Sequence, residues 1–231
     1  MGRMPRVART VVPGVALHVV QRGNNRADCF FADADRLAYL RLLLEYSRET
    51  RCVVHAYCLM TNHVHLLVTP GEPDCCGALM KSVGQQYVQY VNRVYGRTGT
   101  LWEGRFRSSV VASGAYVLAC YRYIELNPVR AGLLRHPSGY EWSSYRCNAE
   151  GAADSLIQPH PVLWALEETD DRRRRAYRSL FDLPLDDEVL DEIRSAARNG
   201  RALGSARKSR GRPSASQEKN RDRPLISLLE K

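Results

Sequence analysis

Residues 52–69 read CVVHAYCLMTNHVHLLVT, and this stretch decides the fold. The segments 52–60 and 63–69 are rich in β-branched and apolar residues, which is typical of strands. Thr61 and Asn62 lie between them, and short polar residues of this kind favour a turn. The stretch is therefore predicted to be a β-hairpin.

The segments on either side of this hairpin predict alternating strands and helices. Apolar residues recur at helical spacing in some of them, whereas β-branched residues dominate others. In chain order these are a strand at 15–22, a helix at 34–50, the hairpin, a helix at about 76–95 and a strand at 100–111. The order β-α-β-β-α-β predicts the α+β class, with a ferredoxin-like or RRM-like split βαβ antiparallel sheet and packed helices. Because such sheets host many functions, the order alone assigns none.

A further helix is predicted from Ser113 to Asn127. Ser113 is a good N-cap, and Pro128 disfavours helical geometry in the residue before it. Tyr123 and Asn127 are four residues apart and share one face of this helix. A phenol and a carboxamide can therefore reach one point together.

His63 and His65 are two residues apart on a predicted strand, so both imidazoles leave the same face. Two histidines so placed can bind one metal ion, since either ring nitrogen is a ligand. Each candidate also has an ordinary structural explanation. The histidines could be polar residues of a half-exposed strand, Tyr123 a core aromatic and Asn127 a helix C-cap.

The composition is typical of a cytoplasmic protein with a polyanionic partner. The 231 residues carry a formal charge of +9, and cations on phosphates release counterions. The N-terminal sequence lacks the apolar core of a signal peptide, and no run is long enough for a membrane span. The seven cysteines form no CxxC pair, so we expect reduced thiols.

Three regions are predicted along the chain. Residues 1–150 form the main domain, 151–197 a helical extension, and 198–231 a basic tail that is disordered in isolation. Between positions 198 and 223 there are nine Lys or Arg against two Asp or Glu. Arg210 and Arg212 belong to an RGRP string, the core of an AT-hook, which lies in narrow A·T minor grooves.

Several stretches together resemble a known family, the IS200/IS605-like single-tyrosine transposases of the HUH type. More narrowly, they resemble the REP-associated tyrosine transposases over about residues 10–150. The specific parts are the two histidines of LMTNHVHLLV and the Tyr-x-x-x-Asn of CYRYIELNPVRAG. HVVQRGNNR, GTLWEGRFRSSVV and GRALGS are also similar to members of that group.

This resemblance implies a metal-dependent single-strand DNA endonuclease and strand transferase. His63, His65 and Asn127 would hold Mg²⁺ or Mn²⁺, although related insertion-sequence enzymes usually have Gln where Asn127 stands. Tyr123 would attack the scissile phosphate, giving a 5′-phosphotyrosine and a free 3′-OH. The expected partner is single-stranded or hairpin-forming, REP-like DNA, and the expected processes are DNA transposition and recombination.

The group that activates Tyr123 is left open by the sequence. Metal-bound water, a nearby base, or the cations Arg122 and Arg130 are all candidates. Glu125 is predicted to face away from Tyr123. Tyr116 shares the face of Tyr123 and is the alternative nucleophile.

Two histidines and several basic residues complete the set of candidates. His18 and His55 lie on strands and could be hydrogen-bond partners of the metal ligands, although structural roles are favoured for both. Arg side chains beside the aromatic residues Trp102 and Phe106 would suit single strands, which are held by phosphate contacts and base stacking. The candidate DNA-binding residues outside the tail are Arg22, Asn24, Asn25, Arg26, Arg105 and Arg107.

Two alternatives remain at this stage. An HUH replication or transfer initiator would use the same chemistry, and a non-catalytic RRM-like protein would bind nucleic acid without a metal or a nucleophile. Whether the protein is a monomer or a homodimer is left open.

Overall fold

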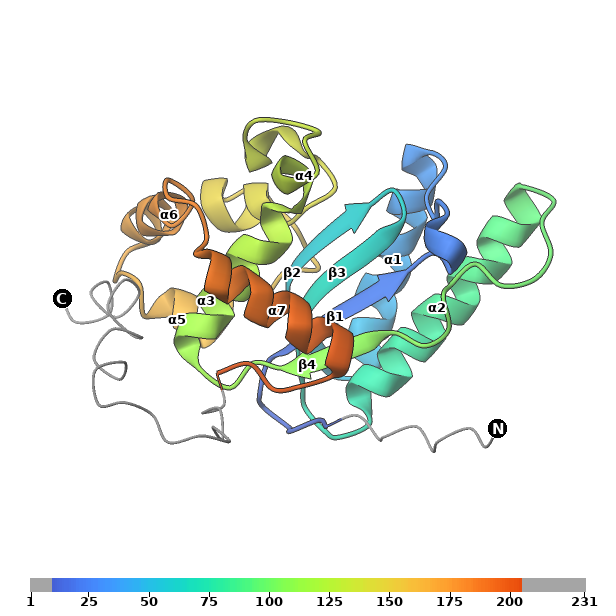
Figure 1. Cartoon of the computed structure of the whole chain (residues 1–231), viewed down its shortest axis with the longest axis horizontal. Helices are drawn as coiled ribbons and strands as arrows, with labels where there is room; N and C mark the ends of the chain where they lie inside the picture. The colour runs from blue at the N-terminus through green and yellow to red at the C-terminus, as the bar shows by residue number, and fades with distance from the viewer. Residues whose placement is uncertain (1–9, 205–231) are drawn as a thin grey trace.

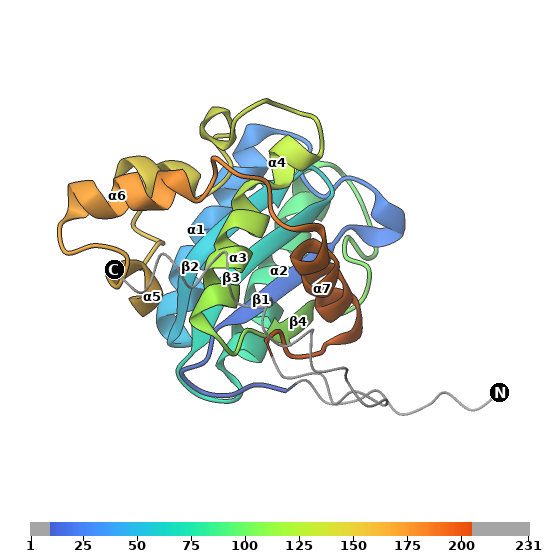
Figure 2. The same ribbon diagram turned by 60° about the vertical axis from the view of Figure 1, so that its left-hand side comes forward.

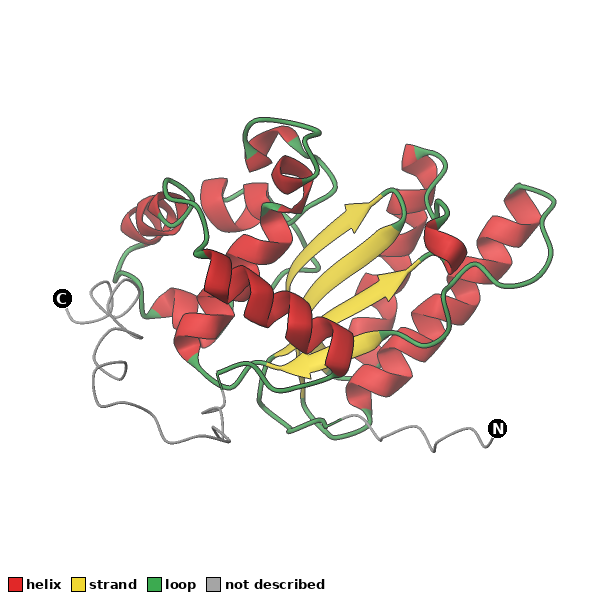
Figure 3. Cartoon of the chain, viewed as in Figure 1, coloured by secondary structure: helices red, strands yellow, loops and turns green. Residues whose placement is uncertain are grey.

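The computed structural model describes residues 10–204, and its centre is one four-stranded antiparallel sheet (Figures 1 and 3). The strand order is β2-β3-β1-β4. The elements up to β4 are β1 (Leu17–Arg22), η1 (Asn24–Arg26), α1 (Asp33–Glu49), β2 (Cys52–Met60), β3 (His63–Pro70), α2 (Cys75–Val94) and β4 (Arg107–Val110). The predicted β-α-β-β-α-β order and the hairpin are confirmed, and with them the ferredoxin-like α+β fold.

The fourth strand is shorter than predicted. We expected residues 100–111 to be extended, but β4 covers only Arg107–Val110. The preceding segment is a loop in which Gly104 has a positive φ of 67°. Trp102 and Phe106 belong to this loop, and their side chains are buried in the core. Arg105 therefore lies in a loop and not on the strand.

The sheet separates two hydrophobic cores. Leu17, Val19, Val64 and Leu66 alternate along β1 and β3 and pack on one face against α1 and α2. The residues between them point to the other face, where α3 (Gly114–Glu125) lies. Figure 1 shows α1 and α2 behind the sheet and α3 in front of it.

The predicted helix from Ser113 is interrupted before it ends. Ser113 is the N-cap as expected, and its Oγ accepts a hydrogen bond from the backbone N–H of Tyr116. However, α3 ends at Glu125, and a short helix α4 (Asn127–Arg130) follows. Pro128 has no N–H to donate to the preceding turn, which explains the break. Asn127 is therefore the first residue of α4 and not the end of the longer helix.

The segment after α4 wraps back onto α3 and the sheet. Its helices are η2 (Pro137–Gly139), η3 (Arg146–Glu150), α5 (Pro161–Trp164), α6 (Asp170–Ser179) and α7 (Asp187–Asn199). Figures 1 and 2 show α7 across β1 and β4, on the same sheet face as α3. Among residues 10–204, no helix is long and apolar enough to cross a membrane.

Glu125 joins α3 to this later segment. Its carboxylate is fully buried and accepts hydrogen bonds from the Ser144 hydroxyl at 2.6 Å, the Asn148 amide at 2.9 Å and the Tyr177 hydroxyl at 2.7 Å. Burial raises the pKa of Glu125 to about 7, while these three hydrogen bonds act in the opposite direction. Glu125 is thus a structural residue, and it faces away from Tyr123 as the sequence predicted.

The boundary predicted for the basic tail is wrong. We placed its start at Arg198, but α7 continues to Asn199 and the chain then pairs with the end of β4. The N–H of Leu203 donates to the Val110 carbonyl at 2.7 Å, and the Leu203 side chain is buried. Arg210 and Arg212 lie outside the described residues. Whether residues 1–150 fold as a domain on their own stays a prediction.

We predict that Leu203→Ala lowers the free energy of unfolding by about 2–5 kcal/mol, the usual cost of deleting a buried leucine side chain. Leu183→Ala is the matched control, because Leu183 is 72% exposed. Denaturant unfolding of the full chain measures both. Equal stability of the two variants would show that the segment after α7 is not part of the fold.

Candidate active site

Three histidines gather on the sheet face that α3 covers. The β1–β3 register pairs Arg22 with His63 and Val20 with His65, so these side chains share one face with His18. His18 Nε2 lies 2.9 Å from His65 Nδ1, and the rings stack with centroids 5.2 Å apart. The His63 ring meets the His65 ring edge-on at 5.0 Å.

Tyr123 contacts this cluster from α3. Its ring lies edge-on to His18 at 5.5 Å and to His65 at 5.6 Å between centroids. The side chain is 9% exposed, so the phenol sits at the boundary between core and solvent. The structure therefore brings the candidate nucleophile to the histidine pair, although they are far apart in the sequence.

Asn127 reaches the same cluster from α4. Its side chain hydrogen-bonds that of His63, whose Nδ1 is 2.6 Å from Asn62 Oδ1. The Asn127 amide nitrogen is buried and has no hydrogen-bond partner within residues 10–204. The short break after Glu125 thus redirects Asn127 towards β3 while keeping it near Tyr123.

The three imidazoles are held neutral. Burial, with the charge of Arg130 adding to it, lowers the pKa of His18 to about 4. Burial also lowers the pKa of His63 to about 4, with Arg22 and Arg130 contributing. The pKa of His65 falls well below its ordinary value, first through burial and then through its charged neighbours. Neutral imidazoles keep the lone pairs that metal binding requires.

His63, His65 and Asn127 have the donor types that a divalent ion accepts. Since His65 Nδ1 is occupied by His18, only Nε2 of His65 is free to serve as a ligand. Among residues 10–204, no group of three or more His, Cys, Asp or Glu side chains is arranged to hold a metal. A metal site here therefore needs the amide oxygen of Asn127, whose side chain lies against His63.

The structure distinguishes between the two cations that the sequence left open. Arg122 is largely buried, and one of its guanidinium nitrogens donates to the carbonyl of Leu183. The guanidinium carbon of Arg130, in contrast, lies 4.2 Å from the centre of the Tyr123 ring. Arg130 is the cation beside the candidate nucleophile.

His18 is the site residue whose role the sequence reasoning missed. We expected a structural role, but His18 contacts both His65 and Tyr123. The available signal was its position in β1, four residues before Arg22, which places both on one face. His55 has the structural role expected, because its ring nitrogens bond the Gln158 carbonyl at 2.6 Å and the Thr69 hydroxyl at 2.8 Å.

Tyr116, the alternative nucleophile, is directed elsewhere. Its hydroxyl donates a hydrogen bond to Glu192 on α7. That contact holds α7 against α3.

The candidate DNA-binding residues lie around one end of the site. Arg22 ends β1 opposite His63, and η1 follows, with Asn25 and Arg26 in left-handed conformations at φ of 52° and 61°. Arg107 lies on β4, pairs with Val20 of β1 and is exposed. Asn24 and Arg105 are also exposed, in η1 and in the loop before β4.

The aromatic part of the predicted DNA surface is wrong. We expected Trp102 and Phe106 to stand beside the arginines and stack on bases. Trp102 is 6% exposed and Phe106 9%, and both pack in the core on the α1–α2 side of the sheet. Neither ring presents a face to a nucleic acid base.

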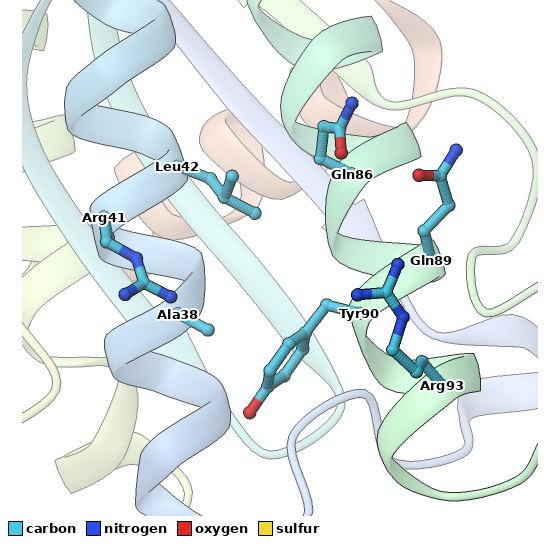
Figure 4. A pocket seen from close by; sticks show the side chains of 7 residues that line it. All are labelled: Ala38, Arg41, Leu42, Gln86, Gln89, Tyr90 and Arg93. Carbon is cyan, nitrogen blue, oxygen red and sulfur yellow. The ribbon is translucent and has the colours of Figure 1, made fainter.

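A hollow between α1 and α2 is remote from this chemistry. It has a volume of about 150 Å³ and is lined by Ala38, Arg41, Leu42, Gln86, Gln89, Tyr90 and Arg93 (Figure 4). Because α1 and α2 cover the opposite face of the sheet from the histidines, this hollow is not part of the candidate active site.

Comparison with protein families identifies the class. The family described as "Transposase IS200 like" matches residues 11–127, which is 117 of the 231 residues. The matched segment contains β1, the histidine pair, Tyr123 and Asn127. The chain belongs to the IS200-like transposase family and is a transposase.

A solved structure shows the same fold, and a second was also found. The chain is similar to a REP-associated tyrosine transposase bound to a REP hairpin, with 17% identity, a TM-score of 0.54, and coverage of 68% of this chain and 93% of that one. A Deinococcus radiodurans protein described as a transposase has 18% identity and a TM-score of 0.36, covering 58% of this chain and 97% of that one. No curated protein matches the chain.

Proposed function

We propose that this transposase is a metal-dependent single-strand DNA endonuclease and strand transferase that acts through a 5′-phosphotyrosine on Tyr123. The observation that carries the proposal is the meeting of Tyr123 with His65 and His18 on one sheet face, with Asn127 bonded to His63 beside them. A candidate nucleophile and candidate metal ligands thus lie together, and this supports a phosphoryl-transfer reaction at this place.

His63, His65 and Asn127 would hold the metal, for which Mg²⁺ or Mn²⁺ suits the mixture of imidazole and amide oxygen. When bound, the ion would polarise the phosphorus and neutralise charge at the transferring phosphate. His18 would fix the ring of His65 through the 2.9 Å bond between their nitrogens, as outer-shell partners of ligating histidines do.

Tyr123 would attack the scissile phosphorus through its phenol oxygen. The Tyr123 Oη–P bond forms while the P–O3′ bond breaks. The phenol gives up its proton, and the leaving 3′ oxygen gains one. The phosphodiester energy is retained in the covalent bond, so attack by another 3′-OH can rejoin strands without ATP. Because α3 is packed into the core, the phenol is held in place before the DNA arrives.

The proposed substrate is single-stranded or hairpin DNA of the REP-like type. The structural neighbour was solved with a REP hairpin. Arg22 lies opposite His63, and the candidate DNA-binding residues Arg22, Asn24, Asn25, Arg26, Arg105 and Arg107 are all exposed. The formal charge of +9 favours a polyanion. We also propose that the chain belongs to the REP-associated subgroup, that it acts in the cytoplasm, and that Arg210 and Arg212 contact DNA.

A non-catalytic RRM-like protein is the alternative from another class. Such proteins present exposed aromatic rings on the central strands, where bases stack. Here the central strands β1 and β3 present His18 and His65 under α3, and the aromatic rings near β4 are buried. An HUH replication initiator shares the chemistry, but the family match favours a transposase.

We predict that Tyr123→Phe abolishes the covalent protein–DNA species while hairpin affinity changes by less than about threefold, because only the attacking oxygen is lost. Tyr116→Phe is the matched control and should still form the adduct. Denaturing electrophoresis with a labelled hairpin and Mn²⁺ measures the adduct. If Tyr123→Phe reacts and Tyr116→Phe does not, the nucleophile has been wrongly assigned.

We predict that His63→Ala, His65→Ala and addition of EDTA each abolish cleavage, whereas Asn127→Ala reduces it less, since an amide oxygen is the weakest ligand. His18→Ala should weaken Mn²⁺ binding about 10–100-fold by releasing His65. Calorimetry of Mn²⁺ binding measures this without DNA, and the exposed His136→Ala is the control. Full cleavage in EDTA would refute the metal mechanism, and unchanged Mn²⁺ affinity in His18→Ala would refute the role of His18.

A further inference from the structure

Arg130 is a largely buried cation for which the fold supplies little compensation. Its guanidinium lies over the Tyr123 ring, and one nitrogen donates to the Tyr123 carbonyl at 2.5 Å. The other terminal nitrogen, Nη1, is buried and makes no hydrogen bond within the described residues. None of the ion pairs formed among residues 10–204 includes Arg130.

Among the described residues, the charged side chain that acts on Arg130 most strongly after Tyr123 is another cation, Arg194. Burial lowers the pKa of Arg130 itself, Tyr123 acts in the opposite direction, and the charge of Arg194 lowers the pKa further. Arg194 is paired with Asp191 on α7 at 3.3 Å.

An unpaired cation in such a place is costly, because a guanidinium loses its hydration on burial. Capping of the C-terminal end of α3 explains only part of the arrangement of Arg130. The Tyr123 carbonyl lies in the last turn of α3, where the break before Pro128 leaves carbonyls without helical partners, and one N–H of Arg130 satisfies it. The free Nη1 and the position over the phenol ring are not needed for a cap.

We propose that Arg130, stacked on the ring of Tyr123, provides an anion-binding site that holds a non-bridging oxygen of the scissile phosphodiester, and holds the same phosphate after its transfer to Tyr123. This inference rests on the proposed function of Tyr123. Arg130 is then a catalytic residue of the reaction, and it lies beyond the family-matched segment 11–127.

The chemistry of the guanidinium suits this role. Its planar array of N–H donors matches phosphate oxygens, and its charge persists at all physiological pH values. As the Tyr123 Oη–P bond forms and the P–O3′ bond breaks, negative charge on the non-bridging oxygens rises, and a donor placed there stabilises that state. Arg130 stays protonated throughout, and the proton that the 3′ oxygen gains does not come from it.

The first test uses inorganic phosphate as the probe, with the full chain in EDTA. Phosphate should raise the melting temperature of the wild type above that in chloride at equal ionic strength. Arg130→Gln should lose this difference and Arg130→Lys should keep part of it. Arg135→Gln, which removes the same charge from an exposed position nearby, should keep it fully.

The second test follows transfer of a labelled hairpin in a single turnover with Mn²⁺. Arg130→Gln should form the Tyr123 adduct about 10²–10³-fold more slowly, the usual effect of losing one donor to transition-state charge. Hairpin affinity should fall only a few-fold, and added guanidinium ion should partly restore the rate of Arg130→Ala.

The outcomes separate the possible roles. If Arg130→Gln melts at a lower temperature but keeps the phosphate effect and the transfer rate, Arg130 is only a cap and the proposal is overturned. If the wild type forms no adduct but shows a phosphate effect that depends on Arg130, the anion site stands and the proposed transfer reaction fails. If neither effect appears in the wild type, both are wrong.

Discussion

The packing of α3 onto the sheet is the contact on which the rest of the structure depends. Val117, Cys120 and Ile124 bury one side of the helix in the core that includes Leu67 of β3. On another side the buried Glu125 binds the later segments through three hydrogen bonds. A helix held in this way has little freedom to slide or rotate, so its position determines where Tyr123 meets the histidines.

The electrostatics of the site follow from the same packing. Burial under α3 keeps the imidazoles neutral, while Arg22 and Arg130 stand close to them without acidic partners among the described residues. Such a site is poorly suited to hold a cation by charge alone. It is suited to an arrangement in which neutral ligands hold a metal and a phosphate supplies the negative charge. Both the proposed function and the anion site at Arg130 depend on this combination of neutral ligands and cations without acidic partners.

Much of the fold and of the site could be predicted because their signals are local. The hairpin 52–69 and the pair of histidines follow from strand periodicity, and the helix that carries Tyr123 follows from helix periodicity and its Ser113 cap. The break after Glu125, which redirects Asn127, did not follow from them. The corrections concern interactions between distant segments. Leu203 pairs with β4, and His18 bonds His65; in both cases the two residues are more than 45 positions apart. The burial of Trp102 depends on contacts of the same long range. No pattern within one segment encodes them.

The most direct test of the account is to locate the bond between protein and DNA. The full chain is incubated with a single-stranded hairpin and Mn²⁺, the covalent species is isolated and digested, and mass spectrometry finds the residue that carries the nucleotide. The account predicts a 5′-phosphate on Tyr123 and on no other residue. A nucleotide attached to Tyr116 or another side chain, or cleavage without any covalent species, would contradict it.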